Sequence, residues 1–138
     1  MSAGLERFVA AQDAHWNAIL AELTEGRKAT HWMWYVFPQL GALGHSAMAK
    51  RYGIDDLEEA RRFHAHPTLG RRLQTCMDLV LEADAPSAED IFGPIDAKKL
   101  RSCATLFDLV KPDDVFGRVL TRYFPEGPDP ATCDLLRG

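Results

Sequence analysis

The stretch THWMWYVFPQL, residues 30–40, combines side chains that are well suited to hold a small planar ligand. Trp, Met, Trp, Tyr, Val and Phe follow one another over residues 32–37, with His31 before them and Gln39 after Pro38. Aromatic faces next to polar groups can stack on a nucleobase, and an imidazole can donate a hydrogen bond or a proton. The segment therefore forms either part of the core or the wall of a binding site.

The residues within this stretch divide by polarity. The mainly apolar side chains are expected in the core: Trp32, Met33, Val36 and Phe37. Trp34 and Tyr35 carry polar groups and are the candidates for ligand stacking. The aromatic and β-branched content favours a strand, whereas Thr30 can cap a short helix that Pro38 ends. We predict a short helix or turn.

A second clue is a polar residue inside an apolar stripe. Residues 5–24 have the three-and-four spacing of an amphipathic helix, and Gln12 projects near the centre of its apolar arc. A glutamine there either binds the backbone of a neighbouring loop or reads an amide or hydroxyl group of a ligand. Asp13, at the border of the arc, is the nearest carboxylate for stabilising a cationic sugar transition state if the chemistry is glycosidic.

Basic residues interrupt the apolar pattern of a later helix, which is expected to begin at a cap formed by Asp96. Lys99 projects at the edge of the apolar arc and Arg101 on the polar side. A lysine can lay its stem along the core with the ammonium group in water. Alternatively, these cations meet a phosphate or carboxylate group at a cleft.

Two hypotheses of function follow. In the first, the protein binds or hydrolyses a small phosphorylated, nucleotide-like ligand, with Trp34 or Tyr35 stacked on its ring. The polar and charged contacts then fall to Gln12, Gln39, His31, Lys99 and Arg101, with His31 and Asp13 as catalytic candidates. In the second, the aromatic segment is core and a surface helix binds a protein partner or forms a homodimer. The residues leave open whether the protein is an enzyme.

The composition argues against other classes. The net charge of -4 disfavours nucleic acid, and no apolar run reaches membrane-spanning length, so neither partner is expected. Three distant cysteines and scattered histidines form no metal-type cluster, and the glycine motifs of phosphate-binding loops are missing. We therefore expect no metal and no cofactor. Reduced thiols and the lack of a secretory pattern indicate the cytoplasm.

The elements that must position these side chains are predicted to be helices. Further helical segments start at a capping box of Asp55 and Glu58, at Pro67, at Asp96, at Asp113, and at Asp129 with Pro130; Ser87 caps a short turn that ends at Gly93. Short Gly, Pro and Asp connections join them, and no alternating strand pattern occurs. The prediction is an all-α, mainly helical fold: one compact domain, residues 1–138, with six to eight helices.

Several stretches together resemble the bacterial family of domain of unknown function 1810: LERFVAAQDAHWNAILAEL, HWMWYVFPQL, GHSAMAKRYGI, AHPTLGRRL and IFGPIDAKKLRSCATLF. The resemblance covers about residues 5–136 and implies a mainly helical architecture without an established activity. The layout is also loosely similar to the NADAR superfamily, helical proteins linked to N-glycosidic bond hydrolysis. That likeness transfers no catalytic residue, because histidine and tryptophan stand where those proteins place an acidic residue.

Overall fold

The computed structural model describes residues 2–137, and every regular element in that range is a helix. The eight α-helices are α1 (Glu6–Glu25), α2 (Met33–Val36), α3 (Ala47–Tyr52), α4 (Leu57–Ala65), α5 (Leu69–Glu82), α6 (Ala88–Val110), α7 (Val115–Tyr123) and α8 (Pro130–Arg137). Two 3₁₀-helices are η1 (Ser2–Leu5) and η2 (Gly41–Leu43). The predicted all-α fold is confirmed. None of these helices is both long and apolar enough to cross a membrane.

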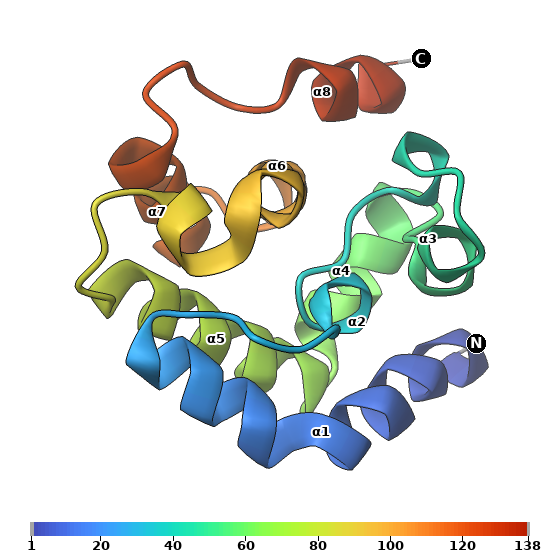
Figure 1. Cartoon of the computed structure of the whole chain (residues 1–138). Coiled ribbons are helices and arrows are strands. Elements are labelled where there is room, and N and C mark those ends of the chain that lie inside the picture. Colours follow the sequence, from blue (N-terminus) through green and yellow to red (C-terminus); the bar gives the residue numbers. More distant parts are fainter. Residues whose placement is uncertain (1, 138) are drawn as a thin grey trace.

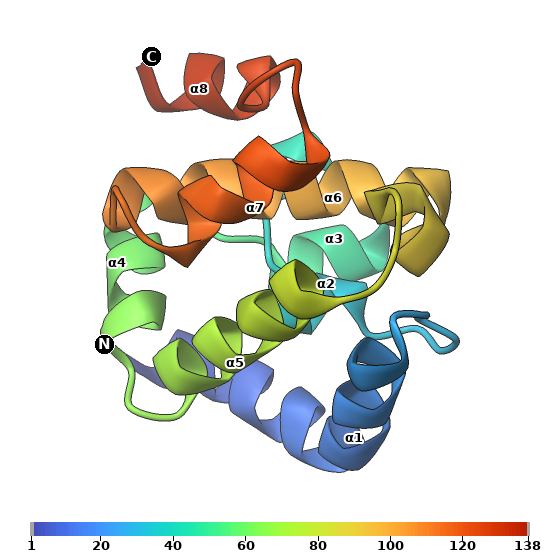
Figure 2. The ribbon, with the colours of Figure 1, turned by 90° about the vertical axis from the view of Figure 1, so that its left-hand side faces the viewer.

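The helices stack in layers around an apolar core. In Figures 1 and 2, α5 lies on α1, α6 and α7 form the next layer, and α8 lies beyond α6 on the side away from α1. Buried rings join these layers: Phe63 of α4 contacts Phe8 of α1 and Phe107 of α6, at centroid distances of 5.1 and 5.5 Å. Because aromatic pairs at such distances bury much area, they hold the layers together.

Several helix ends follow the signals in the sequence. α1 ends at Gly26, whose φ of 74° is the left-handed conformation that glycine adopts without strain. Ser87 caps α6 by accepting a hydrogen bond from the Asp90 amide, and Asp129 caps α8 by accepting one from the Thr132 amide. These caps are confirmed.

Two predicted caps are displaced by one residue. Asp56, not Asp55, caps α4 by accepting from the Glu59 amide, while the Glu59 carboxylate accepts from the Asp55 amide. Likewise Asp114, not Asp113, caps α7. Both sites contain two consecutive aspartates, so the spacing alone fits either register. In each pair the second aspartate is the one whose side chain accepts from a backbone amide of the helix.

The prediction that Asp96 caps a separate helix is wrong. Gly93 has φ 81° and kinks α6, and Pro94 then starts its second part, so Asp96 already lies within the helix. Its carboxylate instead forms ion pairs with Lys28 and Lys99. The helix α3 carries no sequence prediction, because six residues are too few to show a helical period.

The buried thiols give a first testable expectation. Burial raises the pKa of Cys76 to about 12 although Arg72 lowers it, and burial with the nearby Cys76 raises the pKa of Cys103 well above its usual value. Cys133 of α8 is only half-buried. Since the thiolate is the reactive form, Ellman's reagent should titrate one thiol quickly in the native protein and three in denaturant. Rapid native reaction of two or three thiols would contradict this packing.

Candidate functional site

The loop that leads into the aromatic segment is tied to α1 by one carboxylate. Glu22 accepts hydrogen bonds from the amides of Ala29 (2.6 Å) and Thr30 (2.9 Å), from the Thr30 hydroxyl (2.7 Å) and from the Trp32 indole (2.9 Å). Partial burial raises the pKa of Glu22, but these hydrogen bonds outweigh it and lower the pKa from 4.5 to about 2. Thr30 is therefore engaged with α1, and its predicted role as a helix cap is wrong.

The aromatic segment forms the short helix that was predicted, and most of it is core. The four residues assigned to packing are at most 2% exposed: Trp32, Met33, Val36 and Phe37. Tyr35 is buried as well, and its ring contacts that of Tyr52 at 5.2 Å. Burial raises the pKa of Tyr35, and Tyr52 adds to the effect. Only Trp34 of the six consecutive residues 32–37 is half-buried, with part of its ring at the surface.

Gln12 forms hydrogen bonds within the protein, as one of the two roles expected for it requires. Its buried amide donates to the Tyr35 carbonyl (2.7 Å) and accepts from the Arg72 guanidinium (3.4 Å), which also pairs with Asp13 at 2.7 Å. The amide thus fixes α2 on α1. Since buried polar groups need partners, these bonds account for the glutamine in the apolar stripe without a ligand.

Three of the predicted site residues converge on one groove. The Trp34–Lys99 groove, of about 520 Å³, lies between the segment from α2 to α3 and the faces of α6 and α8 that meet it. Its lining includes Trp34, Gln39, His45, Ser46, Lys98, Lys99, Ser102 and Asp129. A narrow inner recess continues from it between Trp34, Gln39, Lys99 and Tyr52. The other predicted site residues lie elsewhere: Gln12, Asp13, His31, Tyr35 and Arg101 line neither the groove nor the recess.

Arg101 is next to the groove-lining Ser102 on α6, but its side chain is directed to the backbone of another segment. Its guanidinium donates to the carbonyls of Gly127 (2.8 Å) and Pro128 (3.0 Å), which holds the connection between α7 and α8 against α6. His31 is exposed at the start of the aromatic segment. Neither side chain is placed to contact a ligand in the groove.

Lys99 of the groove shares one carboxylate with Lys28, although neither Asp96 nor Lys28 lines the groove. Asp96 pairs with Lys28 at 2.9 Å through one oxygen and with Lys99 at 3.2 Å through the other. The Lys99 ammonium also lies 4.7 Å from the centroid of the Trp34 ring, where a cation–π contact stabilises it. One carboxylate for two ammonium groups leaves one positive charge uncompensated, and Lys98 adds another beside it. The charges of these lysines are therefore only partly neutralised by Asp96.

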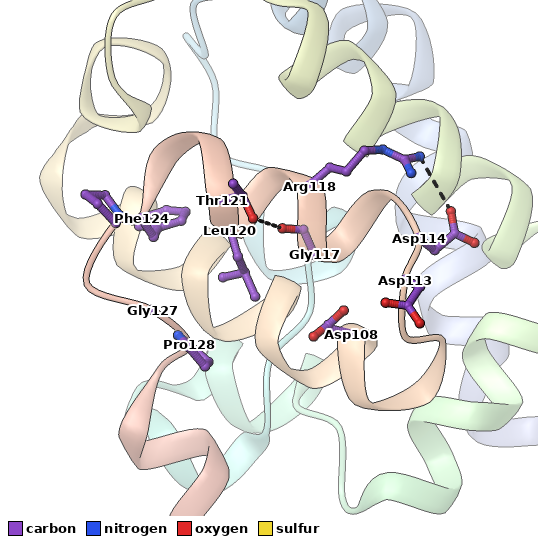
Figure 3. Close-up of a pocket in the computed structure, with 11 residues that line it drawn as sticks. Asp108, Asp113, Asp114, Gly117, Arg118, Leu120, Thr121, Phe124, Gly127 and Pro128 are labelled. Carbon is purple, nitrogen blue, oxygen red and sulfur yellow. Dashed lines mark hydrogen bonds and ion pairs between the residues drawn. The ribbon is translucent and has the colours of Figure 1, made fainter.

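A larger hollow, of about 830 Å³, has the opposite charge. It lies between the end of α6, α7 and residues 124–128 (Figure 3). Asp108, Asp113 and Asp114 line it, and Arg118 already pairs with Asp114 at 3.8 Å. Burial raises the pKa of Asp108, and the charge of Asp113 raises it further. Because three carboxylates face one arginine, this hollow repels the anionic ligand that the sequence predicts. No group of three metal-binding side chains occurs among residues 2–137.

Some residues of the groove carry no clear functional pattern in the sequence. His45 and Ser46 enter it from the loop before α3, and behind it Asp96 pairs with Lys28, which joins a helix and a loop far apart in sequence. The only available signal was the motif GHS, with a histidine and a helix-capping serine next to a glycine. Pairing of Lys28 with Asp96 has no local pattern and becomes visible only in the fold.

These features define an all-helical domain with a groove lined by a tryptophan, two lysines and an aspartate, and comparison with known proteins agrees with the fold. The model of a family described as protein of unknown function (DUF1810) matches residues 2–136, and the chain belongs to this family. This chain is similar to the crystal structure of the conserved hypothetical protein Rv1873 from Mycobacterium tuberculosis, at 45% sequence identity and a TM-score of 0.94. That match covers 97% of this chain and 96% of the other. No curated protein matches the chain at a significant level.

Proposed function

We propose that the protein binds a small phosphorylated, nucleotide-like ligand through its anionic group in the Trp34–Lys99 groove. The observation that carries the proposal is the Asp96 carboxylate shared between Lys28 and Lys99. Because Lys99 has only part of a carboxylate as counter-ion, its remaining N–H groups can donate charge-assisted hydrogen bonds to a phosphate. Lys98 lines the same groove and adds a second cation.

The indole of Trp34 contacts the Lys99 ammonium group, which occupies the place where a ligand ring would stack. The Lys99 ammonium occupies one face of the indole, so a nucleobase can stack on that face only after Lys99 moves aside. The anionic group needs no such movement, since it binds the ammonium where it stands. Recognition of the charge therefore comes first, and the ring of a nucleotide-like ligand is a secondary contact.

Gln39 supplies a polar contact at the mouth of the recess. Its side chain lines both the groove and the recess. An amide carries two donors and one acceptor, so it can read a hydroxyl, carbonyl or amino group of a ligand. Its half-buried position limits competition from water.

The geometry favours binding over hydrolysis. The catalytic candidates His31 and Asp13 lie outside the groove, and Asp13 is paired with Arg72. The carboxylate that lines the groove, Asp129, already accepts three hydrogen bonds through one oxygen. The loose resemblance to the NADAR superfamily still makes ADP-ribose a useful probe, because that compound combines phosphate groups with a planar ring.

The proposal is tested by binding measurements with inorganic phosphate, AMP and ADP-ribose, using thermal shift followed by calorimetry. Lys99→Met keeps the apolar stem but removes the charge, and we expect at least about tenfold weaker binding because a charge-assisted contact is lost. Lys111→Met, an exposed lysine at the end of α6, is the matched control and should bind like the wild type. No binding by any probe, or unchanged binding by Lys99→Met, would refute the proposal.

A further inference from the structure

We infer that the ligand carries a hydrogen-bond donor about 5.4 Å from its anionic group, which is the rise of one helical turn. Asp129 accepts a hydrogen bond from this donor. This inference rests on the proposed function. It narrows the ligand class from anions in general to phosphates that bear a hydroxyl or ammonium group. The reason is that the groove has a cationic part on α6 and an acidic part where Asp129, just before α8, meets Ser102 of α6.

The two parts are separated by one turn of α6. Lys98 and Lys99 line the cationic part, and Ser102, three to four residues later, lines the same groove. One turn of an α-helix advances about 5.4 Å. The Ser102 hydroxyl lies 3.0 Å from the Asp129 carboxylate, so the acidic part begins where that turn ends.

Asp129 is held in place with one oxygen to spare. Its Oδ2 accepts from the Ser102 hydroxyl (3.0 Å), the Thr132 amide (3.2 Å) and the Thr132 hydroxyl (2.6 Å). Its own amide donates to the Thr105 hydroxyl at 2.9 Å. Oδ1 accepts no hydrogen bond from residues 2–137, although Asp129 lines the groove. The carboxylate is thus a fixed acceptor that still has room for one donor.

This arrangement orients a ligand in one direction. A phosphate next to Asp129 would meet a like charge, whereas a phosphate next to Lys99 meets an opposite one. A hydroxyl or ammonium group at the other end of the ligand would then reach Asp129. A bare phosphate gains only the cationic contacts, so it leaves the fixed acceptor unused.

Three related phosphates test the inference on the full chain by calorimetry. Methyl phosphate has only the anion, glycerol 3-phosphate adds hydroxyls, and 2-aminoethyl phosphate adds an ammonium group. We expect at least one of the latter two to bind about fivefold or more tightly than methyl phosphate, in line with one further hydrogen bond. If the donor is ammonium, its advantage should fall with added salt; if it is hydroxyl, the advantage should persist.

Two variants separate the acceptor from the structure of α8. Asp129→Asn keeps a residue that caps helices well but removes the charge, and it should reduce the advantage over methyl phosphate to less than twofold. Thr132→Ala weakens the same cap and leaves the Asp129 charge, so the order of affinities should be that of the wild type. Circular dichroism of both variants checks that the helices remain.

The outcomes distinguish this inference from the proposed function. If methyl phosphate binds and the added donors give no gain, the inference is wrong and the proposed function stands. If Asp129→Asn retains the full advantage, the inference is wrong as well. If none of the three phosphates binds while AMP or ADP-ribose does, the inference is wrong and the proposed function stands; if AMP and ADP-ribose fail as well, both are wrong.

Discussion

Replacing Glu22 by alanine should lower the free energy of unfolding by about 3 kcal/mol at pH 7. The change removes the acceptor of four hydrogen bonds, and it leaves the indole N–H of the buried Trp32 without a partner. Hydrogen bonds to a charged group contribute about 1.5–3 kcal/mol each, but Glu22 is only half-buried and solvent weakens the sum. Chemical denaturation of both proteins measures the difference.

The same variant predicts a dependence on pH. The pKa of Glu22 is lowered from 4.5 to about 2 in the folded protein, so the carboxylate stabilises the fold above pH 4.5. This contribution is lost as the pH falls from 4.5 towards 2, and the gap between wild type and Glu22→Ala should narrow over that range. Glu25→Ala, on the same helix and exposed, should stay within about 0.5 kcal/mol of the wild type. A gap that is constant from pH 7 to pH 3 would refute the assignment.

The second large effect concerns the close approach of two backbone segments next to the recess. Gly41 and Gly53 bring their backbones together where residues 40 and 54 form an isolated bridge. A Cβ atom on Gly53 would lie 2.7 Å from the Ala49 carbonyl oxygen and 2.9 Å from the Gly41 nitrogen, and both are backbone atoms. Gly53→Ala therefore requires the backbone to move, and we expect a loss of about 3 kcal/mol or failure to fold.

The matched control is Gly41→Ala, on the other side of the same close approach. Its Cβ would approach the Gly53 Cα at 3.3 Å, which a small shift relieves, so we expect a loss of about 1 kcal/mol. Thermal and chemical unfolding of the two variants gives the order directly. Equal stability of the two variants would show that the loops are not held as closely as the structure has them. Because Gly53 also lines the recess, a folded Gly53→Ala should bind the ligand more weakly.

The sequence alone determined the helical architecture, because helix ends and apolar stripes are local properties. Gly26 ends α1, Ser87 and Asp129 cap the helices after them, and the apolar spacing marks which faces are buried. It also determined that Trp32 and Phe37 belong to the core. Where two aspartates stand side by side, as at residues 113 and 114, the local signal is degenerate, and the cap is off by one.

The tertiary structure decided which polar residues share a site. Gln12 and Lys99 look equally exceptional in their apolar stripes, yet Gln12 finds its partners in the backbone of α2 and the side chain of Arg72. Lys99 instead shares Asp96 with Lys28, and Lys28 precedes Asp96 by 68 residues in the sequence. A periodicity shows on which face of its own helix a side chain lies. What faces it from other elements depends on how the chain packs, and only the fold contains that information.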